Sequence, residues 1–239
     1  MQAFWIGDEL KENSMALVDF TGKETESGRI FDTTNEKTAK EAGIYRENAV
    51  FKPVPVIVGK KEVLEGIDDA LKEMNEGETK TVKMKPSKAF GERRKELIVI
   101  VPLQEFLNRR IQPMPGLIVD LNGNYGRVQT VSGGRVRVDL NNDLAGKEVE
   151  YEIKVIKEVK NLKEKAELLT EKFFPFKKKV ETKIENGVLK LVFPEEVKKH
   201  AAELLVPFTD YLKGAVPEIK SVEAADEPTG GSEESKEKK

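Results

Sequence analysis

The sequence has no cysteine and a single histidine among its 239 residues. Without cysteine there can be no disulfide, no thiolate nucleophile, no iron–sulfur cluster and no cysteine-ligated zinc. One histidine cannot build a histidine metal cage, and a Ser-His-Asp hydrolase would have to use His200, which lies in a strongly charged run. We therefore predict no metal and no cofactor. The chemistry that remains is that of shape, backbone dipoles, carboxylates and apolar surface.

Long apolar runs are also missing. The longest of them, residues 97–101, has five residues, whereas a helix needs about 20 apolar residues to span a bilayer. The first residues lack the basic and apolar regions of a signal peptide. Charges of the two signs nearly cancel, with 41 Lys and Arg against 43 Asp and Glu. We expect a soluble, cytoplasmic protein without a membrane segment.

The first part of the chain reads as strands around one helix. Alternation of apolar residues predicts three strands, at residues 15–20, 54–58 and 82–84. The first of them should stop at Gly22. Residues 62–77 carry apolar side chains at helical spacing and predict an amphipathic helix that ends at Gly77. Asn35 is expected to cap a short polar helix. An apolar helix face needs a sheet to pack on, and the flanking strands supply it.

Residues 97–146 have the pattern of a separate, β-rich unit. A strand and a short helix are followed by three strands, joined by turns at Asn122-Gly123 and Gly133-Gly134 that are typical of hairpins. A unit of about fifty residues is too small to bury all its apolar side chains. We expect Met114 and Leu117 to contribute to an exposed, substrate-binding apolar surface.

Residues 159–220 predict an α-β-β-α unit. Asn161 and Glu164 form a capping box at the start of its first helix, and Asn186-Gly187 is the strongest hairpin signal in the chain. The unit is small for independent stability, so we expect it to pack on a neighbour or to form a homodimer. Residues 221–239 are rich in charge and poor in apolar residues, which predicts a disordered tail.

Four motifs, taken in order, resemble the FKBP-type peptidyl-prolyl isomerases: residues 18–22, 28–34, 58–67 and 85–91. The insertion that returns at residues 142–147 is similar to the SlyD-like branch with its insert-in-flap domain, and the last unit to the long-chain archaeal type. The resemblance implies an α+β fold in which an FKBP antiparallel sheet wraps on one helix. It divides the chain into an isomerase domain (1–92 and 147–158), an insert-in-flap chaperone domain (93–146), an α-β-β-α domain (159–220) and the tail (221–239).

The resemblance also implies a set of site residues. The positions that match the family's catalytic pocket are Phe20, Phe31, Asp32, Val63, Leu64, Ile67, Phe90 and Tyr151, with Val54 as a further substrate-binding wall. In this match the backbone N–H of Leu64 donates to the ligand carbonyl. Phe90 stands where relatives often have Tyr, and Val54 replaces a common Phe. Ile67 takes the place of a Trp at the pocket floor.

The implied reaction needs little catalytic equipment. An X-Pro bond lies within about 1 kcal/mol of cis/trans balance, but it crosses a barrier of about 18–20 kcal/mol because amide resonance is broken in the transition state. No nucleophile and no proton transfer are required. A dry aromatic pocket favours the twisted amide over the planar, charge-separated one. This reaction therefore suits a chain without cysteine and with one histidine.

Other interpretations remain open at this stage. Without the family match, Phe20, Val63, Ile67 and Tyr151 would be ordinary core residues, and Asp32 could be a turn residue. The chain could be a non-catalytic holding chaperone. It could also bind nucleic acid, because the insert carries Arg109, Arg110, Arg127, Arg135 and Arg137. Tyr125 is the only aromatic in the hairpins of that insert, however, whereas base-stacking platforms use more.

We therefore expect unfolded or nascent polypeptides with X-Pro bonds as partners. The insert would capture the chain and the pocket would isomerise it.

Overall fold

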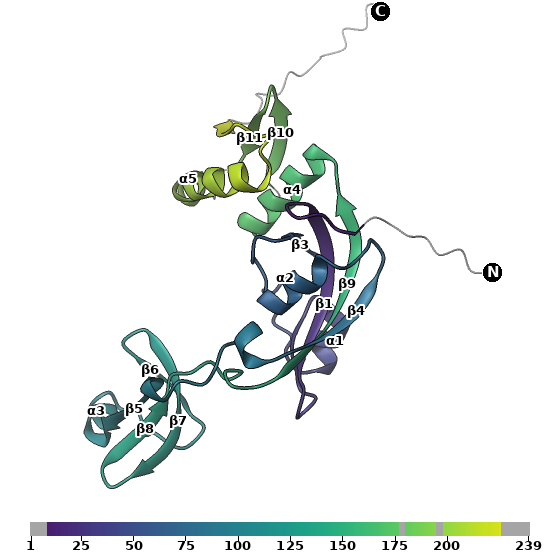
Figure 1. Cartoon of the computed structure of the whole chain (residues 1–239). Helices are drawn as coiled ribbons and strands as arrows, with labels where there is room; N and C mark the ends of the chain where they lie inside the picture. The colour runs from purple at the N-terminus through teal and green to yellow at the C-terminus, as the bar shows by residue number, and fades with distance from the viewer. Residues whose placement is uncertain (1–8, 177–179, 195–197, 226–239) are drawn as a thin grey trace, which may run out of the picture.

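The computed structural model describes residues 9–176, 180–194 and 198–225. Helices and strands form a mixed α+β structure in which three separate sheets follow one another along an elongated molecule (Figure 1). Among the residues described, no helix has the length and apolar character needed to cross a membrane.

The first sheet is built around two long strands, β1 (Met15–Glu24) and β9 (Val149–Val159), which pair antiparallel. One edge of β1 pairs with both β2 (Ile30–Thr33) and β3 (Val54–Ile57), and the far edge of β9 pairs with β4 (Thr79–Met84). The prediction that this strand stops at Gly22 was wrong by two residues. Strand β1 continues to Glu24, with a register shift against β2 after Gly22. That shift lets the strand pass the glycine without ending.

Two helices that lie between β2 and β4 in sequence contact the first sheet. Helix α1 (Glu36–Glu41) begins where predicted, since the Asn35 side chain accepts a hydrogen bond of 3.0 Å from the Thr38 N–H. Helix α2 (Glu65–Leu71) packs against β4 and β9 and is shorter than the predicted 62–77. After Leu71 the hydrogen bonds change to the tighter 3₁₀ kind, from the Glu73 N–H to the Ala70 carbonyl at 3.1 Å and from the Met74 N–H to the Leu71 carbonyl at 3.2 Å, which ends the α-helix.

The second sheet lies between β4 and β9 in sequence and apart from the first sheet in space (Figure 1). Its strands run in the order β5 (Ile98–Pro102), β8 (Arg135–Asp139), β7 (Asn124–Ser132) and β6 (Ile118–Leu121), all antiparallel, with α3 (Leu103–Asn108) after β5. It has a core of its own: Phe106, Val119, Val128, Val136 and Val138. Both predicted turns hold glycines at positive φ.

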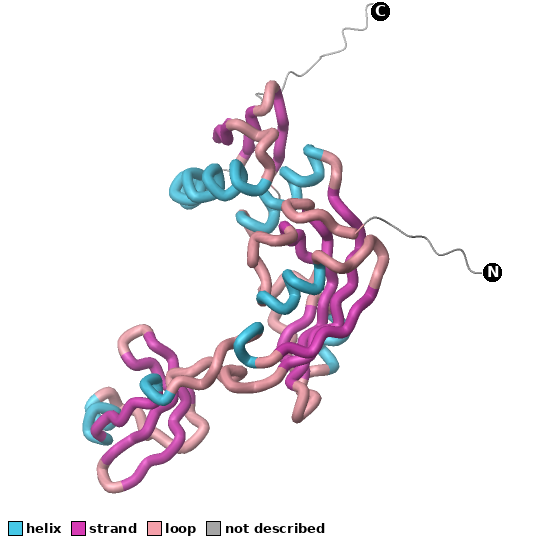
Figure 2. Tube along the Cα trace, viewed as in Figure 1, coloured by secondary structure: helices cyan, strands magenta, loops and turns pink. Residues whose placement is uncertain are grey.

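Two loop segments carry the chain to this unit and back, with short 3₁₀ turns at Pro86–Lys88 and Lys95–Leu97 on the outgoing side (Figure 2). The segments are tied to each other by a backbone hydrogen bond of 2.8 Å from the Gly146 N–H to the Gly91 carbonyl. These two segments, residues 85–97 and 140–148, form a neck that joins the second unit to the first sheet.

The C-terminal elements are α4 (Leu162–Phe173), β10 (Glu181–Glu185), β11 (Val188–Val192), α5 (Lys198–Ala215) and β12 (Ser221–Ala225). The prediction of a disordered tail from residue 221 was wrong for its first five residues, because β12 pairs in parallel with β11. Residues 226–239 lie outside the described ranges. The partner strand supplies the backbone hydrogen bonds, so a polar segment can be a strand here without an apolar pattern of its own.

The C-terminal unit shares its core with the first sheet. Met15 of β1, Ile57 of β3 and Val159 of β9 are buried in one cluster with Leu169, Phe174, Phe208 and their neighbours. Asn161 caps α4 by accepting from the Glu164 N–H at 3.1 Å, as predicted. The small C-terminal unit thus buries part of its apolar surface against the first sheet of the same chain.

Candidate active site

Four aromatic rings meet on the concave side of the first sheet. Tyr151 of β9 lies at the centre, with Phe20 of β1 at 5.9 Å and Phe31 of β2 at 5.7 Å between ring centroids. Phe90, in the loop after the first 3₁₀ turn, lies 5.5 Å from Phe31. All three pairs are edge-to-face, the arrangement that aromatic quadrupoles prefer.

The start of α2 supplies an aliphatic floor to these rings. Ile67 is buried, and Val63 and Leu64 are half-buried in the same cluster, together with Val54 at the start of β3. The structure therefore brings together the residues that the sequence suggested for the pocket: Phe20, Phe31, Val54, Val63, Leu64, Ile67, Phe90 and Tyr151. Asp32 joins them through a hydrogen bond. Met114 and Leu117 lie elsewhere, in the second unit.

The backbone at the start of α2 has an N–H group without an acceptor among the described residues. Leu64 precedes the helix, and its carbonyl accepts from the N–H groups of Ile67 and Asp68. Within the described part of the chain, no hydrogen bond is donated by the Leu64 N–H itself. A helix N-terminus leaves such N–H groups for side chains, water or ligands.

Asp32 is the carboxylate of the cluster. The Tyr151 hydroxyl donates to Asp32 Oδ2 at 3.0 Å. Burial raises the pKa of Asp32 above its ordinary value, against the opposing effect of hydrogen bonds from Tyr151 and Thr33. Burial, and then the Asp32 charge, raise the pKa of Tyr151, so its hydroxyl remains a donor. The Tyr151 hydroxyl thus holds one carboxylate next to the apolar cluster.

Two residues to which the sequence assigned no site role, although both lie in the family motifs, shape this site. Gly22 lies against the Tyr151 ring, and a Cβ there would come within 2.6 Å of the ring. Thr34 joins the two strands below the rings: its hydroxyl donates to Asp19 Oδ1 at 2.8 Å and accepts from the Phe20 N–H at 3.0 Å. The motifs mark both positions, but their roles depend on contacts with residues at least 14 positions away, which the sequence does not show.

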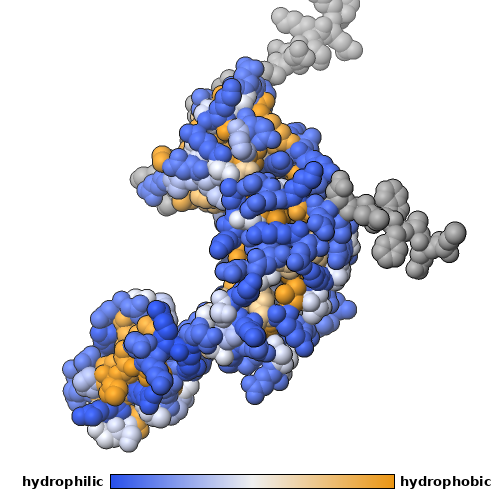
Figure 3. Space-filling view, in the orientation of Figure 1, coloured by the Kyte–Doolittle hydropathy of each residue, from blue (hydrophilic) through white to orange (hydrophobic). Residues whose placement is uncertain are grey.

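The second unit exposes apolar side chains, which gather as an orange area on the face seen in Figure 3. Its large exposed apolar residues are Ile100, Leu107, Met114, Ile118 and Tyr125. Met114 is 58% exposed and Tyr125 is 69% exposed. Leu117, by contrast, is half-buried against the core of the unit. The predicted exposure is therefore confirmed for Met114 and was wrong for Leu117, because Leu117 packs against the core of the unit.

Two of the insert's arginines are already engaged within the protein. Arg127 binds both carboxylate oxygens of Asp143, with the shorter contact at 2.6 Å, and donates to the Gly116 carbonyl at 3.0 Å. Arg109 donates to the Asn122 side chain at 3.3 Å. These contacts weaken the nucleic-acid interpretation, which needs arginines available to phosphates.

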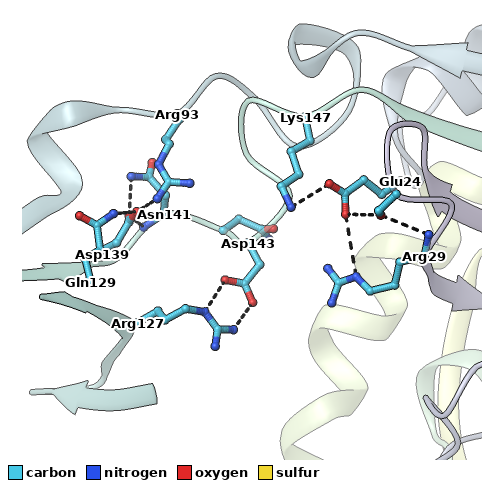
Figure 4. A pocket seen from close by; sticks show the side chains of 11 residues that line it. Glu24, Arg29, Arg93, Arg127, Gln129, Asp139, Asn141, Asp143 and Lys147 are labelled. Carbon is cyan, nitrogen blue, oxygen red and sulfur yellow. Dashed lines mark hydrogen bonds and ion pairs between the residues drawn. The ribbon is translucent and has the colours of Figure 1, made fainter. Parts of the chain in front are cut away.

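A polar cavity of about 510 Å³ lies at the neck, between the first sheet and the second unit (Figure 4). On the side of the second unit, buried Asp139 accepts from Arg93, from Gln129 at 2.9 Å and from the Asn141 N–H at 2.9 Å. On the other side, Lys147 binds Glu24 at 2.9 Å. Hydrogen bonds to Lys147 and Ser27 lower the pKa of Glu24.

A second cavity of about 540 Å³ adjoins both the aromatic cluster and the neck. Phe31 and Ile44 line one side of it, and residues 142–144 line another. It shares Arg29 and Asp143 with the neck cavity and Phe31 with the cluster. The second cavity therefore borders the neck cavity on one side and Phe31 of the aromatic cluster on the other.

Comparison with known proteins identifies relatives of this chain. Residues 7–107 match a family model for FKBP-type peptidyl-prolyl cis-trans isomerase, and residues 99–144 match one for the FKBP26 IF domain. The short-type peptidyl-prolyl cis-trans isomerase of Methanocaldococcus jannaschii is 34% identical over 149 residues, which is 62% of this chain and 90% of the relative. The FKBP-type 16 kDa isomerase of Escherichia coli (strain K12) is 28% identical over 156 residues, covering 63% and 95%.

A solved structure, that of the three FKBP domains of wheat FKBP73, is similar at 18% identity and a TM-score of 0.34. The match covers 64% of this chain and 42% of that one. At that TM-score the likeness is too low to bear on the fold, and the family assignment rests on the sequence matches.

Proposed function

The chain belongs to the FKBP-type peptidyl-prolyl cis-trans isomerases, and we propose that the cluster around Tyr151 is its isomerase site. We also propose that residues 93–146 act as an insert-in-flap chaperone domain. The reaction is the cis/trans isomerisation of X-Pro bonds. The observation that carries the placement of the site is the convergence of four rings, the α2 floor and one carboxylate on a single apolar cluster.

The site would act on the amide by shape and polarity. The proline ring would pack among the aromatic rings, and the Leu64 N–H, which has no described acceptor, would donate to the carbonyl of the bound chain. Exclusion of water disfavours the charge-separated planar amide relative to the twisted one. Lowering the barrier by about 5–7 kcal/mol would accelerate the step by about 10⁴- to 10⁵-fold.

Asp32 would contribute electrostatically rather than as an acid or base. When the amide twists, the carbonyl carbon no longer receives electron density from the nitrogen and becomes more positive. A carboxylate held by the Tyr151 hydroxyl lies at the edge of the same cluster and would stabilise that change. Because no proton is transferred, Asp32 would act as a fixed charge.

The insert would capture the substrate chain. Its exposed apolar residues, among them Met114, Ile118 and Tyr125, offer the kind of surface that binds unfolded segments. The cavity that Phe31 shares with residues 142–144 supports passage of that chain toward the rings. Capture and isomerisation would then occur on one continuous stretch of substrate.

A proline-limited refolding assay tests both parts in the full-length protein. The variant Asp32→Ala combined with Phe90→Ala should lose most of the acceleration on refolding protein and on short X-Pro peptides alike. Equal rates for this variant and the wild type would refute the placement of the site.

The capture surface is tested by exchanging exposed residues only. Met114→Ser, Ile118→Ser and Tyr125→Ser together should reduce acceleration of protein refolding and suppression of aggregation, while short-peptide turnover is retained. The three side chains are exposed, so the exchange leaves the core of the unit intact. Unchanged suppression of aggregation would remove the proposed role of the insert.

We also propose a homodimer through residues 159–220. The supporting observation is that α5 leaves Leu204 and Val206 exposed, although most of its apolar face is buried. Light scattering should give twice the monomer mass, and Leu204→Glu with Val206→Glu should return it to one. A monomer mass for the wild type at all concentrations would refute the dimer.

A further inference from the structure

A groove of about 200 Å³ lies where the loop before β3 meets the end of α4. Its apolar walls come from Val50, Pro53 and Val54 on one side and from Leu168, Pro175 and Phe176 on the other. Val54 belongs both to this groove and to the cluster that forms the proposed isomerase site. The groove therefore borders that site at Val54 and lies between it and α4 of the C-terminal unit.

Hydrogen bonds across the groove hold its two walls together. Lys172 of α4 donates to the Pro55 carbonyl at 3.0 Å and to Glu62 Oε2 at 2.7 Å. Tyr211 of α5 donates to the other oxygen of Glu62 at 2.7 Å. Since Glu62 directly precedes Val63 of the site, the C-terminal unit is anchored at the rim of the pocket. The groove is thus formed before any ligand binds, which lowers the entropic cost of binding.

The lining indicates an apolar ligand group. The charged groups at the groove are paired: Lys52 with Glu171, and Lys172 with Glu62. The volume is below the range of about 300–1,000 Å³ typical of pockets for drug-sized molecules. It suits a single apolar side chain. Val50, which is 64% exposed, stands at the opening.

We propose that this groove binds an apolar side chain of the substrate polypeptide, a few residues from the X-Pro bond, and so determines which prolines are isomerised fastest. The proposal rests on the isomerase site proposed above, because that site is what brings a polypeptide to Val54. The C-terminal unit is then part of the substrate-binding surface of the enzyme.

Peptide kinetics with the full-length protein test this. The two peptides of each pair contain the same Ala-Pro bond and differ at one position, where one has Leu and the other has Ala. This position lies two to four residues from the proline, before or after it, and changes from pair to pair. In at least one pair, the wild type should show kcat/KM about 10-fold higher for the Leu peptide, as expected for one apolar side chain in a pocket. Val50→Glu should abolish this preference by placing a charge at the opening.

Ala49→Glu is the matched control. It adds the same charge one residue away, at an exposed position that does not line the groove, and should keep the preference. A wild type that accelerates neither peptide would overturn the proposed isomerase function. A wild type that accelerates both equally in every pair, or a Val50→Glu variant that keeps the preference, would overturn the groove alone.

The absence of cysteine allows a direct measurement of occupancy. Val50→Cys and Ala49→Cys each introduce the single thiol of the chain. The Leu peptide should slow alkylation at position 50 and leave alkylation at position 49 unchanged. Equal alkylation rates at position 50 with and without the peptide would refute binding in the groove.

Discussion

Gly22→Ala should reduce both the stability and the activity of this isomerase, because the residue lies against the ring of Tyr151. A Cβ at this position would be 2.6 Å from Cζ, 2.7 Å from Cε1 and 3.0 Å from Cε2 of the ring. Carbon atoms in favourable contact are about 3.5–4.0 Å apart. The ring would have to move by about 1 Å to relieve the overlap.

The surroundings of Tyr151 make that movement costly. The side chain is 2% exposed, and Phe20 and Phe31 pack against its ring. Its hydroxyl is 3.0 Å from Asp32, so the movement would break that hydrogen bond. Overpacking a core costs about 1–3 kcal/mol, and losing a hydrogen bond to a charged group costs about 1.5–3 kcal/mol. We expect a loss of about 2–5 kcal/mol, after partial relaxation.

Urea unfolding and turnover of an X-Pro peptide measure the two effects. Gly214→Ala serves as the control, since Gly214 lies in α5 with open space around it and alanine favours a helix over glycine by about 1 kcal/mol. The control should be as stable as the wild type or more so. A Gly22→Ala variant with wild-type stability and turnover would refute the packing argument. A double-mutant cycle with Tyr151→Leu should give a coupling of at least about 1 kcal/mol.

Three further substitutions probe one half-buried and two buried carboxylates. Asp32→Asn should be more stable than the wild type at neutral pH and less active. Burial raises the pKa of Asp32 in the folded state above its ordinary value of 3.8. The wild type therefore loses stability as the pH rises from 3.8 through the folded-state pKa, whereas the Asn variant does not. Unfolding curves from pH 3 to 7 should show the stability difference between variant and wild type growing with pH and then levelling. Asp68→Ala should cost about 1–3 kcal/mol in urea unfolding, because the 1%-exposed carboxylate accepts from the Gly59 N–H at 2.8 Å; an unchanged midpoint would contradict this. Asp139→Ala should leave peptide turnover intact but speed hydrogen exchange in the neck, since it releases Arg93; unchanged exchange there would show that the neck does not depend on this contact.

The parts of the fold that could be predicted from sequence are those fixed by neighbouring residues. Asn35 and Asn161 each cap a helix through a residue three positions on. The Asn186-Gly187 turn fixes the hairpin of β10 and β11, because positive φ at both residues matches the twist of the strands. In each case the signal and the structure that it determines lie within a few residues of each other.

The parts that could not be predicted depend on distant partners. The strand β12 exists because β11, which precedes it by about thirty residues, pairs with it. The hydrogen bond between Tyr151 and Asp32 joins residues 119 positions apart. The family resemblance could suggest that both residues belong to one site, but only the folded chain shows that one orients the other.

The groove on α4 has the same origin and explains why a small C-terminal unit can matter to catalysis. Burial of Met15, Ile57 and Val159 joins its core to the sheet, and Glu62 joins its helices to the rim of the pocket through Lys172 and Tyr211. Burial raises the pKa of Tyr211, which keeps its hydroxyl a donor to Glu62 across the physiological range. We therefore expect a change in the C-terminal unit to affect the segment that carries Val63 and Leu64. Substitutions at its surface facing β3 should alter substrate preference in peptide turnover, whereas those on its far side should leave that preference unchanged.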